Sequence, residues 1–409
     1  MLTVLAIGYV WPEPNSSAAG TYMMSLLKTF LGQNWQVTFA TPATKSDHMF
    51  DLASININTQ SIALNDSSFD DFIADLNPDI VLFDRFMMEE QFGWRVEKAC
   101  PNALKILDTE DLHFLRQARH QAYKQNRKVN IDDMRSDMAL REVAAILRCD
   151  LSLIISPVEY ELLQREFGVN QNLLLQLPFM LELSGTSLPS FDDRAHFMSI
   201  GNFRHAPNWD AVLWLKQQIW PLIRKQLPQA QLHVYGAYPP PKATQLHDES
   251  QGFLVKGWAT DANEVMQQAR VCVAPLRFGA GIKGKLAEAM INGTPNVTTD
   301  VGAEAMACGL EWSGLIGQDA EQIADCAVKL YLDQALWETC QQNGFKIIER
   351  GYNRSELAVK LVDAITYQRE NLQQVRNQNF TGLMLRHHHH KSTQYMSQWI
   401  EAKNKLKSE

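Results

Sequence analysis

The segment FGAGIKGKLAEAM, residues 278–290, carries residue types that can hold a phosphate group. Gly279, Gly281 and Gly284 fit the dinucleotide pattern G-x-G-x-x-G, and Gly279, Gly284 and Lys285 fit the start of the P-loop pattern G-x-x-x-x-G-K-[ST]. An apolar run typical of a strand precedes the segment, and an apolar-periodic run typical of a helix ends it. Free amides at the start of such a helix, together with the helix dipole, form an anion site. The spacing therefore predicts a phosphate-bearing ligand.

Each of the two nucleotide motifs is incomplete at one point. A P-loop needs a hydroxyl after its lysine to hold magnesium, and this chain has Leu286 there, on the helix face that should point into the core. The dinucleotide motif is supported by Asp300, which follows Gly281 by 19 residues. However, residues 275–278 separate the expected strand from the first glycine, whereas the motif normally starts where its strand ends. Both a dinucleotide enzyme and a tight turn that the glycines merely permit stay open.

Glu288 favours a third interpretation, in which the ligand is a nucleoside diphosphate. It follows Lys285 by three residues, about one helical turn, so that a carboxylate stands one turn beyond the anion site. Such a carboxylate can accept two hydrogen bonds from a ribose diol, while the helix start, Lys283 and Lys285 neutralise the diphosphate. The alternative for Glu288 is a surface ion pair with Lys285, which contributes only a few tenths of a kcal/mol.

Strands and helices that alternate along the chain must position these residues. Strands apolar on both faces suit a parallel sheet covered by helices. The alternation, repeated twice, predicts an α/β protein with two Rossmann-like doubly wound domains, whose ligand cleft lies outside the carboxyl ends of the strands. The expected strands are residues 2–8, 35–41, 79–84, 103–108, 151–156, 196–202, 230–236, 252–257, 270–275 and 295–300.

The break between the two domains is expected in LSGTSLPSFDDR, residues 183–194, which is rich in turn residues and lacks periodicity. We therefore predict an amino-terminal domain over residues 1–183, a carboxy-terminal domain over 195–365 and a helical extension over 366–409. Three apolar residues of the extension share a helical face, which predicts that the extension packs back on one of the domains: Met396, Trp399 and Ile400.

The overall composition excludes several classes of protein and partner. A net charge of −8 gives no general attraction to nucleic acid or anionic membranes, so an anionic ligand needs a local site. The apolar start is too short for a membrane span and is expected as a buried strand, and no other stretch is long enough to cross a bilayer. The six cysteines are dispersed without C-x-x-C spacing, which argues against a zinc site or a disulfide framework and favours a reducing cytoplasm.

Three segments give the chain a clear resemblance to a known family. PLRFGAGIKGKLAEAMINGTPNVTTDVGAEAM, residues 275–306, resembles the donor-binding segment of group 1 (GT4-type) glycosyltransferases of the GT-B fold. Residues 201–223 resemble the opening of their carboxy-terminal domain, and DTEDLHFLRQAR, residues 108–119, resembles part of their amino-terminal domain. The similarity runs along most of residues 1–365. It implies a GT-B glycosyltransferase that moves a sugar from a nucleotide-diphosphate sugar to an acceptor hydroxyl.

In that family a Glu-x7-Glu pair marks the donor site, and Glu288 matches its second member, the ribose ligand. The first member falls on Ala280, so one carboxylate expected near the donor sugar or its phosphates is absent. The resemblance implies that the backbone amides of Gly281 and Ile282 still reach the ligand.

The phosphate-binding Arg and Lys of the family are also displaced. The nearest candidates after the first strand of the carboxy-terminal domain are Arg204 and His205, with Lys283 and Lys285 as replacements for the phosphate charge. Arg204 can alternatively pair with a surface carboxylate. Trp258 lies in a segment that resembles the nucleobase-facing loop, where it can stack on the base or belong to the core.

In the amino-terminal half, Gly20 lies where the family has a small-residue turn that lets donor and acceptor approach the backbone; the alternative is an ordinary flexible loop. His113 matches a histidine that these enzymes present to the donor sugar. Asp108, Glu110 and Asp111 crowd the same loop, and one of them can position the acceptor hydroxyl. Glu110 and Asp111 can equally serve as charges at a helix start.

A basic face is expected along a helix within residues 116–128. Basic residues recur there every three or four positions, which suits an anionic or lipid-linked acceptor, although a merely solvated face is the commoner outcome. They are Arg116, Arg119, His120, Lys124, Arg127 and Lys128.

The resemblance implies a metal-independent enzyme that has no cofactor and retains the anomeric configuration, with His113, Lys285 and Glu288 as catalytic residues. Consistently, the chain contains no Asp-x-Asp, the metal-binding signature of the other main glycosyltransferase fold. The expected partners are a nucleotide-sugar donor and a glycan or lipid-linked saccharide, met in the cytoplasm or at the inner face of the membrane. A sugar-nucleotide epimerase, an NAD-dependent Rossmann oxidoreductase and a catalytically degenerate nucleotide-binding scaffold remain alternatives.

Overall fold

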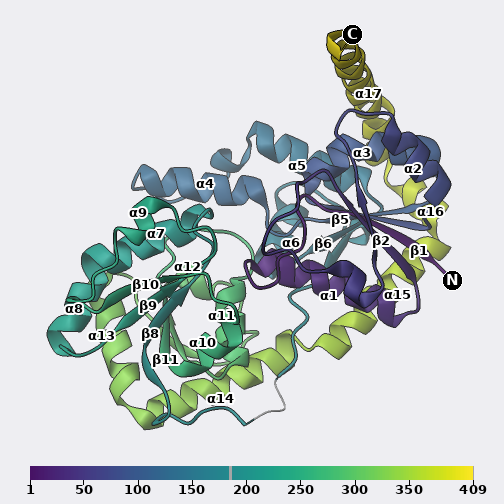
Figure 1. Ribbon diagram of the computed structural model, residues 1–409. Helices are drawn as coiled ribbons and strands as arrows, with labels where there is room; N and C mark the ends of the chain where they lie inside the picture. Colours follow the sequence, from purple (N-terminus) through teal and green to yellow (C-terminus); the bar gives the residue numbers. More distant parts are fainter. Residues whose placement is uncertain (184–186, 409) are drawn as a thin grey trace.

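Two parallel β-sheets with helices on both faces form the body of the protein, in a computed structural model that describes residues 1–183 and 187–408 (Figure 1). The first sheet has seven strands in the order β3-β2-β1-β4-β5-β6-β7, and the second has six in the order β10-β9-β8-β11-β12-β13. The strand order reverses between β1 and β4 in the first sheet and between β8 and β11 in the second. Ligands of doubly wound sheets bind at such switch points.

The first sheet is buried on both faces, as its apolar strands require. Its central strands β4 and β5, with the sequences IVLFD and LKILD, have no exposed residue. The strands are β1 Thr3–Ile7, β2 Gln36–Thr41, β3 Asn58–Ser61, β4 Ile80–Asp84, β5 Leu104–Asp108, β6 Leu151–Ile154 and β7 Leu174–Gln176. The helices are α1 Ala18–Gly32, η1 Leu52–Ile55, α2 Ser68–Leu76, α3 Phe86–Ala99, α4 His113–Lys124, η2 Asp132–Met134, α5 Asp137–Arg148, α6 Pro157–Arg165 and η3 Gln171–Leu173.

The second sheet has the same architecture and leads directly into the predicted phosphate site. The strands are β8 Ala195–Ile200, β9 Leu232–Tyr235, β10 Phe253–Gly257, β11 Ala269–Ala274, β12 Asn296–Thr298 and β13 Gly314–Ile316. The helices are α7 Ala206–Trp214, η4 Leu215–Ile219, α8 Trp220–Gln226, α9 Pro241–Thr244, α10 Ala262–Gln268, α11 Gly284–Ile291, α12 Asp300–Ala303, α13 Ala320–Leu332 and α14 Gln334–Gly351.

The predicted fold class is confirmed, and every expected strand is present. Three strands were not expected. β3, with the sequence NTQS, is polar and exposed at each residue, and β7 and β13 have only three residues each. These short strands pair at or near the edges of the sheets, where the hydrophobic pattern is weakest.

The chain passes between the domains twice, at neighbouring points. The outgoing and returning segments are hydrogen-bonded, because the Leu181 amide donates to the Tyr352 carbonyl at 2.7 Å and the Arg354 amide donates to the Leu181 carbonyl at 3.0 Å. Part of the expected break, residues 184–186, lies outside the described residues. The expected carboxy-terminal domain extended to residue 365, whereas in the structure the chain has already returned to the first domain at Arg354.

The last three helices, α15 Arg354–Glu370, α16 Leu372–Gln378 and α17 Phe380–Ser408, follow this return (Figure 1). Buried ion pairs fix them to the first domain, with Arg376 2.8 Å and Arg386 2.7 Å from the Asp150 carboxylate. The expected apolar contact face of the extension is not the one used, because Met396 and Trp399 are each 59% exposed. Among the described residues, no helix is both long and apolar enough to span a bilayer.

Candidate active site in the cleft between the domains

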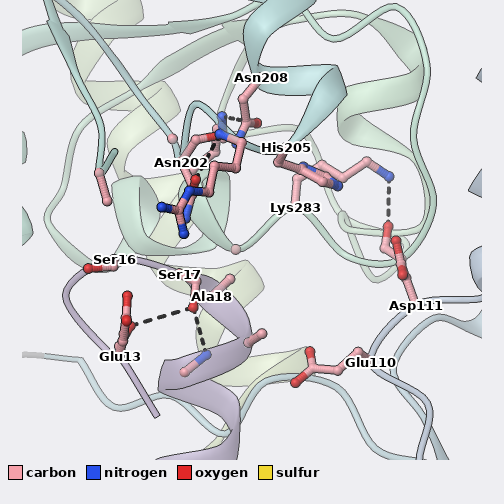
Figure 2. A pocket seen from close by; sticks show the side chains of 18 of the residues that line it. Glu13, Ser16, Ser17, Ala18, Glu110, Asp111, Asn202, His205, Asn208 and Lys283 are labelled. Carbon is pink, nitrogen blue, oxygen red and sulfur yellow. Dashed lines mark hydrogen bonds between the residues drawn. The ribbon is translucent and has the colours of Figure 1, made fainter. Parts of the chain in front are cut away.

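A cavity of about 790 Å³ lies between the two domains, at the carboxyl ends of both sheets. Figure 2 shows Asn202, Asn208 and Lys283 of the second domain facing Glu13 and residues near the start of α1 across it. Of the ten residues predicted for the site, nine line this cavity: Gly20, His113, Arg204, Trp258, Gly281, Ile282, Lys283, Lys285 and Glu288. The fold therefore brings nine of the predicted residues, which are far apart in the chain, to one cavity.

The starts of α1 and α11 meet at this cavity. A side chain at Gly284, the first residue of α11, would bring its Cβ to 2.3 Å from the Cβ of Ala18, the first residue of α1. Gly20 is equally confined, because a Cβ there would lie 2.5 Å from the backbone of Glu13. Because both positions are glycine, the first turns of α1 and α11 can lie close together at the edge of the cavity. Both helix dipoles favour an anion there.

Two lysines of the α11 start line the same space. The Lys283 Nζ donates to the Gly281 carbonyl and the Lys285 Nζ to the Asn208 side-chain oxygen, each at 2.7 Å. Burial lowers the pKa of both lysines to about 8, against the opposing effects of Glu304 on Lys283 and of Cys272 and Glu288 on Lys285. An anion bound beside them would favour their charged forms.

Glu288 lies one turn into α11, and its carboxylate lines the cavity. Among the described residues it has neither a hydrogen-bond nor an ion-pair partner, since Lys285 turns to Asn208. Burial raises the pKa of Glu288 to about 6, and Lys285 counteracts this shift. The surface ion pair that was the alternative for Glu288 is not formed. The carboxylate is free to accept hydrogen bonds from a diol.

An aromatic group forms the wall beside Arg204. The Arg204 guanidinium lies 3.7 Å from the Tyr238 ring centroid rather than on a carboxylate. Trp258 is 36% exposed and stacks on His48 of the first domain, with ring centroids 4.3 Å apart. Tyr238 also donates to the Glu13 carboxylate at 2.8 Å. Trp258 is therefore not a core residue, and these stacking partners and polar groups connect the two domains.

The amino-terminal wall carries His113 and acidic side chains. The His113 Nδ1 lies 3.1 Å from the Asp111 carbonyl and 3.3 Å from the Glu142 carboxylate, which orients the ring. Asp108 does not line the cavity, in contrast to Glu110 and Asp111, because it ends β5 with its side chain fully buried. Burial and the neighbouring Asp84 raise the pKa of Asp108 to about 8. The two acidic residues that follow Asp108 line the cavity in its place.

Several residues of the predicted basic face hold the domains or the helix in place. Arg119 donates to the Gly279 carbonyl at 2.9 Å and pairs with Glu304 at 2.7 Å, both in the second domain. Arg116 pairs with Asp111 at the cavity, and Arg127 pairs with Asp133 at 2.6 Å. This face is thus largely engaged within the chain.

A carboxylate of the first domain, Glu159, holds the loop beside Ala280 but does not itself line the cavity. Glu159 of α6 accepts a hydrogen bond from the Gly281 amide at 2.8 Å and another from the Leu112 amide at 3.1 Å. The Gly281 amide, which was expected to reach the ligand, is therefore already engaged. Burial, followed by the charge of Asp111, raises the pKa of Glu159 to about 8. The sequence pattern does not indicate four further residues of this region: Glu159, Glu13, Asn208 and Tyr238. Their partners lie in distant segments, and no local spacing signals them.

Comparison with known proteins agrees with this geometry. Residues 194–333 match the family model described as Glycosyl transferases group 1. No curated protein sequence matches the chain. The second domain is therefore similar to the group 1 glycosyltransferase domain over residues 194–333.

Solved structures extend the similarity to the whole fold. WaaG, a glycosyltransferase involved in lipopolysaccharide biosynthesis, has a TM-score of 0.64 and 13% identity, over 89% of this chain and 99% of that chain. HepE of Anabaena, in complex with UDP and glucose, has a TM-score of 0.68 and 11% identity, over 90% of this chain and 100% of that chain. A TarM mutant of S. aureus, in complex with Fondaparinux, alpha-GlcNAc-glycerol and UDP, has a TM-score of 0.55 and 14% identity, over 72% of this chain, which spans 57% of that chain. The fold is GT-B.

Proposed function

We propose that this protein is a glycosyltransferase that transfers a sugar from a nucleotide-diphosphate sugar to a hydroxyl of a glycan or a lipid-linked saccharide. The observation that carries the donor assignment is the partnerless Glu288 carboxylate in a cavity where two helix starts and two lysines meet. An anion site with a free carboxylate one helical turn away matches a diphosphate joined to a ribose. The complex of HepE with UDP and glucose makes UDP the first nucleotide to test.

In this proposal, residues of the second domain stabilise the leaving diphosphate. Its developing charge is met by the α11 start, Lys283 and Lys285, so that no metal ion or cofactor takes part in its departure. Arg204 lies on the same wall and can turn from the Tyr238 ring to a phosphate. The ring of Trp258 offers one face for the nucleobase.

The first domain would hold the sugar and the acceptor. His113, oriented by Glu142, faces the cavity and can donate a hydrogen bond to the donor sugar. Glu110 and Asp111 line the acceptor side and can position the hydroxyl that attacks. We further propose retention of the anomeric configuration and work at the cytoplasmic face of a membrane, where a lipid-linked acceptor would be met. Closure of the domains, seen in the contacts of Glu13 and Arg119, would exclude water that hydrolyses the donor.

The test is calorimetric titration of UDP, ADP and GDP into the wild type, Glu288→Ala and the control Glu264→Ala. Glu264 is an exposed carboxylate on α10 that does not line the cavity. We expect one diphosphate to bind the wild type and the control alike, and Glu288→Ala to bind it about 10- to 100-fold more weakly, as for lost hydrogen bonds to a charged group. Equal affinity of all three proteins for each diphosphate would contradict the donor assignment.

Product analysis separates the remaining functions. With the matching nucleotide sugar, a glycosyltransferase gives a glycoside only when acceptor is added, whereas an epimerase converts the donor without acceptor. Binding of NAD, followed by fluorescence, would instead favour an oxidoreductase. A scaffold without turnover would bind the diphosphate and form no product with any acceptor. Its binding of the diphosphate would still be weakened by Glu288→Ala.

A further inference from the structure

Helix α17 has its large apolar side chains on the face that points to solvent. Its opposite face is buried, with Arg386 7% and Ser397 3% exposed. At about 100° per residue, five of the exposed large apolar residues fall within an arc of roughly 100°, and a sixth, Met396, lies about 60° beyond it. The five are Phe380 at 67% exposed, Met384 at 46%, Tyr395 at 66%, Trp399 at 59% and Leu406 at 74%. We call these five residues the α17 stripe.

The stripe is not covered by the chain itself. In Figure 1 the carboxy-terminal end of α17 extends away from the first domain. The five side chains of the stripe are each at least 46% exposed. A helix that only packs on a domain normally carries polar residues on its outer face. Exposed His388 and Lys391 separate Met384 from Tyr395, so the exposed apolar surface gathers at Tyr395, Trp399 and Leu406. Such a patch marks an interaction site. The stripe thus needs a partner other than the two domains.

The charge around the stripe is strongly positive. Glu401 is the one carboxylate in residues 380–408, and it is engaged by Ser67 at 2.7 Å and Lys405 at 2.8 Å. The Lys403 ammonium lies 5.0 Å from the Trp399 ring. This local charge stands against a net charge of −8 for the whole chain. The exposed lysines of the helix are Lys391, Lys403, Lys405 and Lys407.

We propose that the α17 stripe docks the protein on an anionic lipid surface. Tyr and Trp side chains suit the boundary between headgroups and acyl chains, and neighbouring lysines suit anionic headgroups. A second copy of the chain fits less well, because it would bring two lysine-rich helices together. The inference rests on the proposed work at the face of a membrane and names the surface that makes the contact, but its readouts do not depend on sugar transfer. It assigns the contact to α17 rather than to the basic face of α4, whose arginines are paired.

The experiment is flotation of the full chain with vesicles of phosphatidylcholine alone and of phosphatidylcholine mixed with phosphatidylglycerol. We expect flotation with the mixed vesicles only. A Tyr395→Ala/Trp399→Ala variant should bind at least tenfold more weakly, since it loses the apolar area of two aromatic rings. A variant with Lys403 and Lys407 changed to Gln should lose about fivefold per lysine. The matched control is Tyr367→Ala/Leu332→Ala, whose parent residues are 59% and 62% exposed outside α17.

A second measurement reports the contact directly. Brominated phosphatidylglycerol should quench part of the tryptophan fluorescence of the wild type, and this quenching should be lost in Trp399→Phe, which still floats. Equal flotation with both vesicle types, or no flotation at all, would overturn the proposal. So would a dimer, seen by sedimentation without lipid, that dissociates in the Tyr395→Ala/Trp399→Ala variant, because the stripe would then be a self-interface. All these readouts are independent of nucleotide binding and turnover.

Discussion

Replacing Glu288 by Gln is expected to stabilise the ligand-free protein while weakening its hold on a nucleoside diphosphate. The Glu288 carboxylate has no hydrogen-bond or ion-pair partner among the described residues, and burial raises its pKa from 4.5 to about 6 despite Lys285. This difference corresponds to roughly 2 kcal/mol of unfolding free energy that the charged form costs. The Gln side chain has the same shape and no charge to desolvate, so the variant should recover up to about that amount at neutral pH.

The sign of the effect can be checked against pH. Because the folded protein favours the protonated carboxyl of Glu288, the unfolding free energy of the wild type falls as pH rises from 4.5 to about 6 and stays lower above that. Glu288→Gln lacks this dependence. The advantage of the variant should therefore be full above pH 6 and vanish below 4.5. Denaturant unfolding of both proteins across this range, followed on the transition of the second domain, measures it.

Binding should move in the opposite direction. Hydrogen bonds to a charged acceptor contribute about 1.5–3 kcal/mol and those to a neutral acceptor about 0.5–1.5 kcal/mol, so Glu288→Gln should bind the preferred diphosphate about 10-fold more weakly at neutral pH. The affinity of the wild type should also fall below pH 6, because the Glu288 carboxylate is then protonated. The pH dependence of the affinity of Glu288→Gln serves as the reference, because it records only the titration of the ligand. A variant that is less stable at neutral pH and binds as tightly as the wild type would refute the reasoning.

Three further outcomes follow from the same contacts. Lys285→Met should weaken the binding of the nucleoside diphosphate about tenfold or more, because in the proposed site the Lys285 ammonium binds the phosphates. The affinity for the nucleoside should be unchanged in paired titrations. Gly284→Ala should raise the radius of gyration in X-ray scattering by separating the two helix starts, while Gly32→Ala, with nothing within 4 Å of its added Cβ, should not. Although burial opposes ionisation, the hydrogen bond from Arg376 and neighbouring cations lower the pKa of Asp150 to about 2, so its stabilisation is present above pH 3.8 and is lost as pH falls toward 2. Asp150→Asn should cost about 3–5 kcal/mol in denaturant unfolding at neutral pH, because it leaves two buried arginines unpaired.

The fold could be predicted because the strands carry a strong local signal. Apolar runs such as IVLFD and LKILD must be buried on both faces, and their alternation with helices leaves few topologies. β3 could not be found in this way, since NTQS is polar and pairs with β2 only through its backbone. The return of the chain at Arg354 was also missed. The helices on both sides of it are amphipathic, and their pattern does not say which domain each one covers.

The candidate site likewise contains residues that the sequence predicts and residues that it does not. Lys283, Lys285 and Glu288 belong to one strand–loop–helix unit, and their spacing alone places them at one helix start. Asp108 was expected beside them at the cleft, but as the last residue of β5 it is fully buried, while Glu110 lines the cavity. The carboxylates of Asp108 and Glu110 lie within 4.8 Å of each other, so Asp108 lies just behind the cavity lining, and the sequence does not determine how deeply a residue at a strand end is buried.

Contacts between the domains explain how the chain accommodates Ala280. The amide of the next residue, Gly281, is held by Glu159, which also holds the amide that precedes His113. One buried carboxylate thus joins the donor loop to the acceptor loop, and it can do so only when the domains are closed. Burial and the charge of Asp111 raise the pKa of Glu159 to about 8, although the hydrogen bonds from both amides lower it. Opening the cleft would remove the Gly281 hydrogen bond and expose Glu159 to water, so that the chemistry of this carboxylate is coupled to the closure that assembles the site.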